Sequence, residues 1–209
     1  SYISLSEALR HAGFKNSKGV EIVYVESEDI QENGTDCLSE MDAILIPGGF
    51  GDRGIEGMIQ SIEYARKNDI PFLGICLGMQ AAVIEYARNV LDHKDANSTE
   101  FNSSTSAPVI AMITEWMNDD GSKENRDENS DLGGTMRLGA QECLFAKGTK
   151  AKDIYGADSV VERHRHRYEF NNRYREELEK NGLVFSGFSK DGLAEMIEIK
   201  DHPWFIGCQ

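Results

Sequence analysis

The chain has 209 residues, of which 36 are acidic and 22 basic, giving a formal net charge of −14. This surplus of negative charge argues against a nucleic-acid-binding protein, because neutralising phosphates requires excess Lys and Arg. No apolar run is long enough to cross a bilayer, so we expect no membrane partner. The cysteines Cys37, Cys76, Cys143 and Cys208 are widely spaced without a C-x-x-C pair. This spacing favours a reducing cytoplasm over a secreted disulfide framework.

The N-terminal part alternates predicted helices and strands. Residues 5–12 favour a short amphipathic helix that ends near Gly13, and residues 20–25 alternate as a strand does. Residues 42–46 form a continuous apolar run typical of a buried parallel strand. Residues 54–67 carry an apolar stripe at helical spacing. Together with the strand and helix that follow, this order predicts a parallel α/β sheet with right-handed crossovers.

The segment 74–80, GICLGMQ, lies between a predicted strand at 70–73 and a predicted helix at 81–88. A cysteine between a strand and a helix, with glycine two residues to either side, is the cysteine form of a nucleophile elbow. The glycines allow the tight turn, and the helix N-terminus lowers the thiol pKa and offers N–H groups to an anion. The alternative is a buried cysteine in an ordinary turn. The agreement of both glycines with the strand–helix context favours Cys76 as a catalytic thiol.

A glycine-rich loop, PGGFG at 47–51, follows the strand at 42–46. It could be an ordinary turn, since Gly and Pro punctuate any strand end. Ligands of α/β sheets bind at the carboxyl ends of the strands, where this loop and Cys76 would both lie. A backbone N–H near Gly49 would then join that of Leu77 in an oxyanion hole for a thiolate attacking a carbonyl.

Two polar segments carry candidate ligand-binding side chains. Glu100, in the segment DANSTEF at 95–101, is either a loop residue or an acceptor for the ammonium group of an amino acid. Arg167, in the segment RHRHRYE at 163–169, could hold a substrate carboxylate through a bidentate pair. A basic strand edge at the surface is an equally good interpretation of Arg167.

The two histidines in the second segment raise the question of a metal. His164 and His166 share a face of a predicted strand and could ligate zinc. No cysteine or carboxylate set completes a tetrahedral site in the sequence. We therefore expect no metal here, and the net charge argues against a nucleic-acid patch.

After residue 117 the chain no longer alternates predicted helices and strands. Residues 118–131 are acidic and polar, and they predict a solvated loop. Short strand-like pieces then follow one another at residues 183–186, 196–199 and 204–207.

These motifs together resemble those of the class I glutamine amidotransferases of the Cys-His-Glu type, and within them the glutaminase domains of CTP synthases. The elbow and the glycine loop are shared across class I glutaminases. The more diagnostic segments are 95–101, GGTMRLG at 133–139 and ERHRHRYE at 162–169. The resemblance covers the chain apart from 118–131. It implies an α/β fold with a mainly parallel central sheet and helices on both faces, flavodoxin-like and in three layers.

The resemblance also implies roles for individual residues. Cys76 would be the nucleophile that hydrolyses glutamine through a cysteinyl thioester, with Gly49 and Leu77 supplying the oxyanion hole. Glu100 would bind the ammonium end of glutamine and Arg167 its carboxylate. The implied substrate-binding residues are Gly49, Leu77, Gly78, Met79, Gln80, Glu100 and Arg167.

For the whole protein, the resemblance implies that the ammonia passes to an N-terminal synthetase domain. There ATP and Mg²⁺ would drive the amination of UTP to CTP, and GTP would activate the glutaminase as an allosteric effector. The complete enzyme would be a homotetramer in the cytoplasm. No cofactor is implied for the glutaminase itself, which we expect to occupy residues 1–209 as one domain.

Two departures from the family pattern lie at the ends of the chain. The family's triad His and Glu would come directly after Gln209, and a first strand would come before Ser1. We therefore expect a piece of a longer protein, almost inactive by itself. Two other interpretations remain: another cysteine-elbow α/β hydrolase, or a non-catalytic glutaminase-like interaction domain. None of the five histidines matches the triad motif: His11, His93, His164, His166 and His202.

Overall fold

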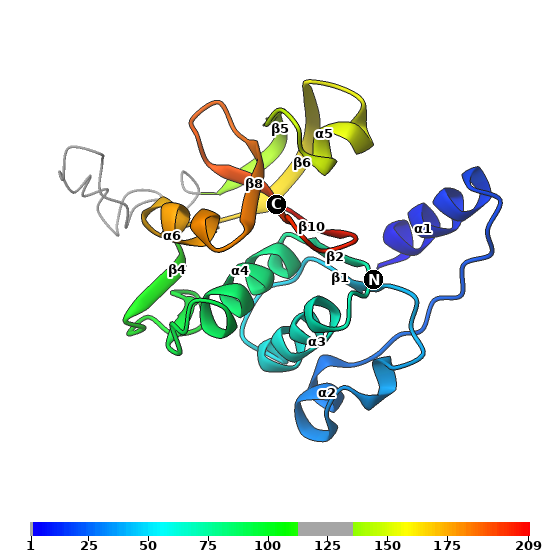
Figure 1. Cartoon of the computed structure of the whole chain (residues 1–209), viewed down its shortest axis with the longest axis horizontal. Coiled ribbons are helices and arrows are strands. Elements are labelled where there is room, and N and C mark those ends of the chain that lie inside the picture. Colours follow the sequence, from blue (N-terminus) through cyan, green and yellow to red (C-terminus); the bar gives the residue numbers. More distant parts are fainter. Residues whose placement is uncertain (1, 113–135) are drawn as a thin grey trace.

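The computed structural model describes residues 2–112 and 136–209 (Figure 1). The acidic segment 118–131, predicted to be a loop, lies outside the described residues. The helices are α1 (Ile3–Lys15), α2 (Ser27–Asn33), α3 (Ile55–Lys67), α4 (Leu77–Asn89), α5 (Lys150–Tyr155) and α6 (Arg175–Lys180), with 3₁₀ turns η1 (Asp36–Leu38) and η3 (Asn172–Tyr174). The strands are β1 (Ile44–Ile46), β2 (Phe72–Ile75), β3 (Ala96–Ser98), β4 (Ala107–Met112), β5 (Arg137–Phe145), β6 (Ser159–His166), β7 (Tyr168–Phe170), β8 (Leu183–Phe188), β9 (Ala194–Ile199) and β10 (Phe205–Cys208).

The main sheet has the strand order β1-β2-β10-β9-β8-β5-β6, and a smaller sheet has the order β3-β4-β7. In the main sheet, β1, β2 and β10 run parallel, whereas every other neighbouring pair is antiparallel. The sheet is thus mixed, where the sequence predicts a mainly parallel one. The connections at 189–193 and 200–204 explain this difference, because a parallel crossover needs a dozen or more residues.

The two faces of the main sheet bury different side chains. On β2, Phe72 belongs to the larger hydrophobic cluster, whereas Leu73 packs against a smaller one, as expected when side chains alternate along a strand. On β10, Phe205 likewise belongs to the larger cluster and Ile206 to the smaller one. The rings of Phe72 and Phe205 stack with centroids 4.4 Å apart. Helices α3 and α4 cover the larger cluster, and Ala151 of α5 covers the smaller. The predicted α/β class with helices on both faces is therefore confirmed.

Helix α3 confirms the apolar stripe predicted for residues 54–67. Its buried positions recur every three or four residues, as the helical period requires. The stripe packs towards α4, which is buried along nearly its whole length between α3 and the sheet (Figure 1). The stripe consists of Ile55, Ile59, Ile62 and Ala65, with Met58 partly buried beside them.

The predicted strand at 20–25 is wrong. Within the described part of the chain these residues form no ladder. Val23 and Tyr24 stay 52% and 71% exposed, so neither face of the segment is buried. An alternating pattern becomes a strand only where a neighbouring strand accepts its backbone hydrogen bonds.

Among the described helices, none combines the length and the apolar character that a membrane crossing requires.

A buried ion pair joins α3 to α4. Glu85 is fully buried, and Arg66 binds it through Nη2 to Oε1 at 2.6 Å and through Nε to Oε2 at 2.9 Å. Arg66→Met would leave this carboxylate buried without its counter-charge. We expect the free energy of unfolding to fall by about 3–5 kcal/mol, measured by urea denaturation.

Lys67→Met is the matched control, because within residues 2–112 and 136–209 the ion pair of Lys67 is an exposed one, with Glu63 on the same helix. Its loss should cost about 0.5 kcal/mol or less. Equal losses for Arg66→Met and Lys67→Met would show that the Arg66–Glu85 pair does not hold the two helices together.

Candidate active site

Cys76 occupies the single position between the end of β2 and the start of α4. Its backbone has φ 51° and ψ −104°, a conformation that residues other than glycine rarely adopt. Its N–H donates to the carbonyl of Cys208 at 2.7 Å, and its carbonyl accepts the first helical hydrogen bond, from the N–H of Gln80 at 3.0 Å. The predicted elbow is therefore present, with the strained residue at its apex, as is common at functional sites.

The two flanking glycines are needed for close approach rather than for an unusual φ. A Cβ on Gly74 would lie 2.6 Å from the carbonyl oxygen of Gly78. A Cβ on Gly78 would lie 2.3 Å from the carbonyl oxygen of Ile46 on β1. Neither glycine has a positive φ. The tight turn is thus made by Cys76, and the glycines let the first turn of α4 press against both strands.

The glycine loop after β1 faces the elbow. A Cβ on Gly48 would lie 3.4 Å from the Cβ of Cys76, and one on Gly49 would lie 3.1 Å from Cδ2 of Leu77. The sheet register places β1 and β2 as parallel neighbours, so both strand ends open at the same edge. The two residues predicted for an oxyanion hole, Gly49 and Leu77, are therefore in contact. Their oxyanion role stays a prediction.

An open pocket of about 330 Å³ lies at this edge. Five predicted site residues line it, and Phe50, Met136, His166 and Tyr168 line it as well. The sequence could have indicated these four as site residues, because each lies in or beside one of the motifs described above. The predicted residues at the pocket are Gly49, Cys76, Gln80, Glu100 and Arg167.

Three other predicted substrate-binding residues do not line the pocket. Leu77, Gly78 and Met79 are buried in the first turn of α4. Met79 packs below β10, where a Cβ on Gly207 would lie 2.8 Å from its Cγ. A contact of these residues with a ligand would have to come from their backbone, so their predicted binding role remains a prediction.

The pocket holds an acidic and a basic side chain from different elements. Glu100 follows β3, and its Oε1 accepts a hydrogen bond from the N–H of Gly51 at 3.0 Å. Arg167 lies in the turn between β6 and β7. Glu100 and Arg167 are more than 60 positions apart in the sequence. Only the family resemblance predicted that both would lie in one site.

Gln80 connects the pocket floor to the end of the chain. Its Nε2 donates to the carbonyl of Tyr168 and to Oε1 of Gln209, both at 3.0 Å. Gln80 is only 3% exposed. Because both N–H bonds of its amide are already used, the side chain holds α4, Tyr168 and Gln209 in one arrangement.

The pKa of the Cys76 thiol is raised above its ordinary value of 9.0. Burial is the largest cause, and the negative charges of Glu100 and Glu169 add to it. Hydrogen bonds from Leu77 and Gln209 oppose the shift without overcoming it. The N–H of Leu77 at the helix N-terminus lowers this pKa, as the sequence predicts, but desolvation outweighs it and the net shift is upward.

A second group of buried ionisable side chains includes His166, which lines the pocket. Burial raises the pKa of Glu169 well above its ordinary value and that of Glu195 to about 7. Arg137 approaches both carboxylates, with Nη2 3.1 Å from Glu195 Oε1 and Nε 3.6 Å from Glu169 Oε1. Burial also lowers the pKa of His166 to about 4, so its imidazole is neutral near pH 7.

Comparison with known proteins shows the family to which the chain belongs. The glutamine amidotransferase class-I family profile matches residues 1–209. The chain belongs to the class I glutamine amidotransferase family. It is similar to the glutaminase domain of the Trypanosoma brucei CTP synthase, solved with bound acivicin, at 35% identity and a TM-score of 0.86, covering 100% of this chain and 78% of that one.

A glutamine amidotransferase from Thermotoga maritima shares the fold at 13% identity. Its TM-score is 0.56, and the match covers 96% of this chain and 67% of that one. The class I fold expected from the motifs is confirmed by these matches.

The raised pKa of Cys76 predicts how its reaction with a small neutral alkylating agent, iodoacetamide, depends on pH. Only the thiolate reacts, so the rate should rise about tenfold per pH unit from pH 7 to pH 9 without levelling. Peptide mass spectrometry at each pH measures the rate, with Cys76→Ser to assign the modified peptide. A rate that is already constant above pH 7 would contradict the raised pKa.

Proposed function

We propose that this chain is the glutaminase domain of a CTP synthase and that Cys76 hydrolyses L-glutamine. The observation that carries the proposal is a cysteine on a strained elbow, facing a pocket that also holds Glu100 and Arg167. The similar trypanosomal domain binds acivicin, a glutamine analogue, which supports the same substrate here. Residues 1–209 form one glutamine amidotransferase domain in this proposal.

Substrate recognition follows from the two charges of the pocket. A free amino acid carries an ammonium and a carboxylate on one carbon, and it needs complementary groups for both. Glu100 accepts from the ammonium, and the planar guanidinium of Arg167 binds the carboxylate in a bidentate pair. The side-chain amide of glutamine then points towards Cys76, and the backbone of Gly78 and Met79 lies below it.

In the chemical step, the sulfur of Cys76 attacks the amide carbon of glutamine. The oxygen becomes negatively charged and accepts hydrogen bonds from the N–H groups of Gly49 and Leu77. As the tetrahedral intermediate collapses, the C–N bond breaks and the nitrogen takes a proton and leaves as ammonia. The thioester that remains is hydrolysed by water, which gives glutamate and restores the thiol.

A base must take the thiol proton, because burial keeps Cys76 protonated near neutral pH. In the proposal this base is a histidine directly after Gln209, oriented by a glutamate. The position suits it: Gln209 forms a side-chain hydrogen bond with Cys76, and its N–H donates to the carbonyl of Glu195 at 2.8 Å. A residue that continues the chain from Gln209 therefore emerges beside the thiol.

His166 is the alternative base within the chain, since it also lines the pocket. Both of its ring nitrogens are already engaged, Nδ1 with the carbonyl of Tyr168 at 3.2 Å and Nε2 with Nδ1 of His164 at 3.0 Å. Its pKa of about 4 also makes it a weak proton acceptor at pH 7. These contacts favour the external histidine.

The resemblance extends the proposal to the complete enzyme. The ammonia would pass to a synthetase domain that uses ATP and Mg²⁺ to convert UTP to CTP, with GTP as an activator and a homotetramer as the assembly. The glutaminase domain itself would need no cofactor. A cytoplasmic location suits the four cysteines, all of which are free thiols.

Cys76→Ala in the full-length protein tests the function. We expect loss of glutamine-dependent CTP formation, with CTP formation from added ammonia nearly unchanged, because the thiol takes part only in glutamine hydrolysis. Cys37→Ala, at an exposed cysteine, is the control and should change neither rate. Failure of the unmodified protein to release ammonia from glutamine would favour another cysteine-elbow hydrolase or a non-catalytic domain.

Arg167→Ala tests the carboxylate contact. A charge-assisted hydrogen bond of about 1.5–3 kcal/mol corresponds to an increase of about 10- to 100-fold in KM for glutamine. The kcat should change less, because the contact exists in both the ground state and the transition state. Arg163→Ala, on the exposed side of β6, is the matched control. An unchanged KM would mean that Arg167 belongs to a basic strand edge.

A further inference from the structure

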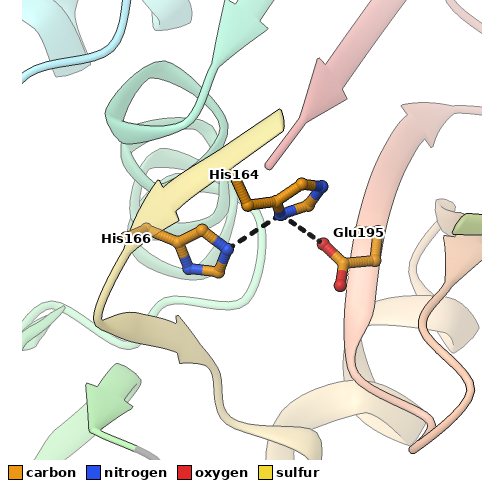
Figure 2. Close-up of side chains that lie close together, drawn as sticks. All are labelled: His164, His166 and Glu195. Atoms are coloured by element: carbon orange, nitrogen blue, oxygen red, sulfur yellow. Dashed lines mark hydrogen bonds and ion pairs between the residues drawn. The ribbon is translucent and has the colours of Figure 1, made fainter. Parts of the chain in front are cut away.

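Strand β6 directs two histidines away from solvent towards a carboxylate of β9 (Figure 2). His164, His166 and Glu195 are all buried, with exposed fractions of 5%, 2% and 2%. One ligand atom from each lies within 4.8 Å of the other two. The sequence suggested the two histidines as zinc ligands but not Glu195, which follows His166 by 29 positions and lies on a strand that is not their neighbour in the sheet.

Two of the three distances between these atoms are close to those of a zinc coordination sphere, and the third, between His166 and Glu195, is within 4.8 Å. Zn–N and Zn–O bonds of about 2.0–2.1 Å in a tetrahedron place neighbouring ligand atoms about 3.3–3.4 Å apart. Nδ1 of His164 lies 3.0 Å from Nε2 of His166 and 3.4 Å from Oε2 of Glu195. To admit the ion, the side chains of His166 and Glu195 would adjust until all three ligand atoms lie at this spacing.

The hydrogen bond made by the other nitrogen of His166 supports ligation. Its Nδ1 lies 3.2 Å from the carbonyl oxygen of Tyr168, which can only accept, so Nδ1 carries the proton. The lone pair of Nε2 therefore faces His164 and Glu195. A metal-binding histidine commonly donates its second N–H to a backbone carbonyl in this way.

Glu195 contributes an oxygen that has no other role among the described residues. Its Oε1 accepts from Nη2 of Arg137 at 3.1 Å, whereas its Oε2 is buried without a hydrogen-bond partner there. A buried carboxylate oxygen without a partner is costly unless a cation satisfies it. Oε2 is also the atom that points towards His164 (Figure 2).

From this juxtaposition we infer that His164, His166 and Glu195 form a site for Zn²⁺. Two imidazoles and one carboxylate are a ligand set for zinc, whereas Mg²⁺ and Ca²⁺ require oxygen ligands. Three protein ligands leave the fourth position to water. The ion can enter through the pocket, because His166 lines it.

Zinc at this site would act on the pocket through the backbone of β6. The ion would link β6 to β9 across the two strands that separate them, β5 and β8. His166 directly precedes Arg167, so the metal would fix the turn that carries this guanidinium. The ion is a positioning element in this inference and does not contact glutamine.

The test is Zn²⁺ binding by the full-length protein, measured by competition with a chromophoric chelator. We expect one equivalent to bind, and His164→Asn and Glu195→Gln each to weaken the affinity at least about 100-fold, the upper end of the effect of losing outer-shell partners. Neither variant changes a residue that lines the pocket. His93→Asn, which breaks an exposed His–Glu pair with Glu177, is the matched control and should bind as the unmodified protein does.

X-ray absorption of the zinc-loaded protein gives a readout independent of activity and of folding of the variants. The expected first shell contains nitrogen and oxygen only. A sulfur ligand would move the ion to Cys76 or Cys208 and would overturn the assignment. Equal affinity of the unmodified protein and both ligand variants, or no binding at all, would overturn it as well. Neither result would affect the glutaminase proposal, which the Cys76→Ala experiment decides separately.

Discussion

The close approach of the first turn of α4 to the main chain of β1 is the constraint on which the rest of the site depends. Gly78 has no room for a Cβ against the carbonyl oxygen of Ile46, and Gly74 has none against Gly78. Because α4 starts in contact with β1 as well as β2, its first residues lie directly below the loop that leaves β1. Cys76 and Gly49 consequently meet at the same edge of the sheet, and the pocket opens between them.

The parallel part of the fold could be predicted from local patterns. The stripe of α3, the apolar run of β1 and the elbow are each encoded within a dozen residues, and buried parallel strands read as continuous apolar runs. The antiparallel part could be read only as separate strands. The positions of β5 and β6 beside β8 depend on which strand edges pair in the folded chain. No local sequence pattern indicates this pairing. Residues 20–25 show the same limit, because their alternation predicts a strand and no described neighbour pairs with it.

The candidate site, like the fold, has a part that the sequence predicts and a part that it does not. Cys76 and the glycine loop could be predicted from the sequence, because their chemistry lies in short motifs at strand ends. Glu195 could not be predicted as a neighbour of the histidines, because the curl of the sheet brings them together. β5 pairs with β6 along eight residues of each strand but with β8 only at Leu144 and Phe145. The pair of β5 and β6 is therefore attached to the sheet at one end only, which leaves its other end free to turn one face towards β9, where His164 meets Glu195. Two intervening strands then separate residues whose side chains are in contact.

Electrostatics link substrate binding to activation of the thiol. Burial raises the pKa of Cys76, and the carboxylates of Glu100 and Glu169 oppose ionisation further. In the proposed binding mode, the ammonium of glutamine pairs with Glu100 and offsets its negative charge. One of the two charges that disfavour the thiolate would thereby be compensated when the substrate arrives. In this binding mode the thiol of Cys76 would be easier to deprotonate in the complex than in the free protein, which would limit its reaction with other electrophiles while the pocket is empty.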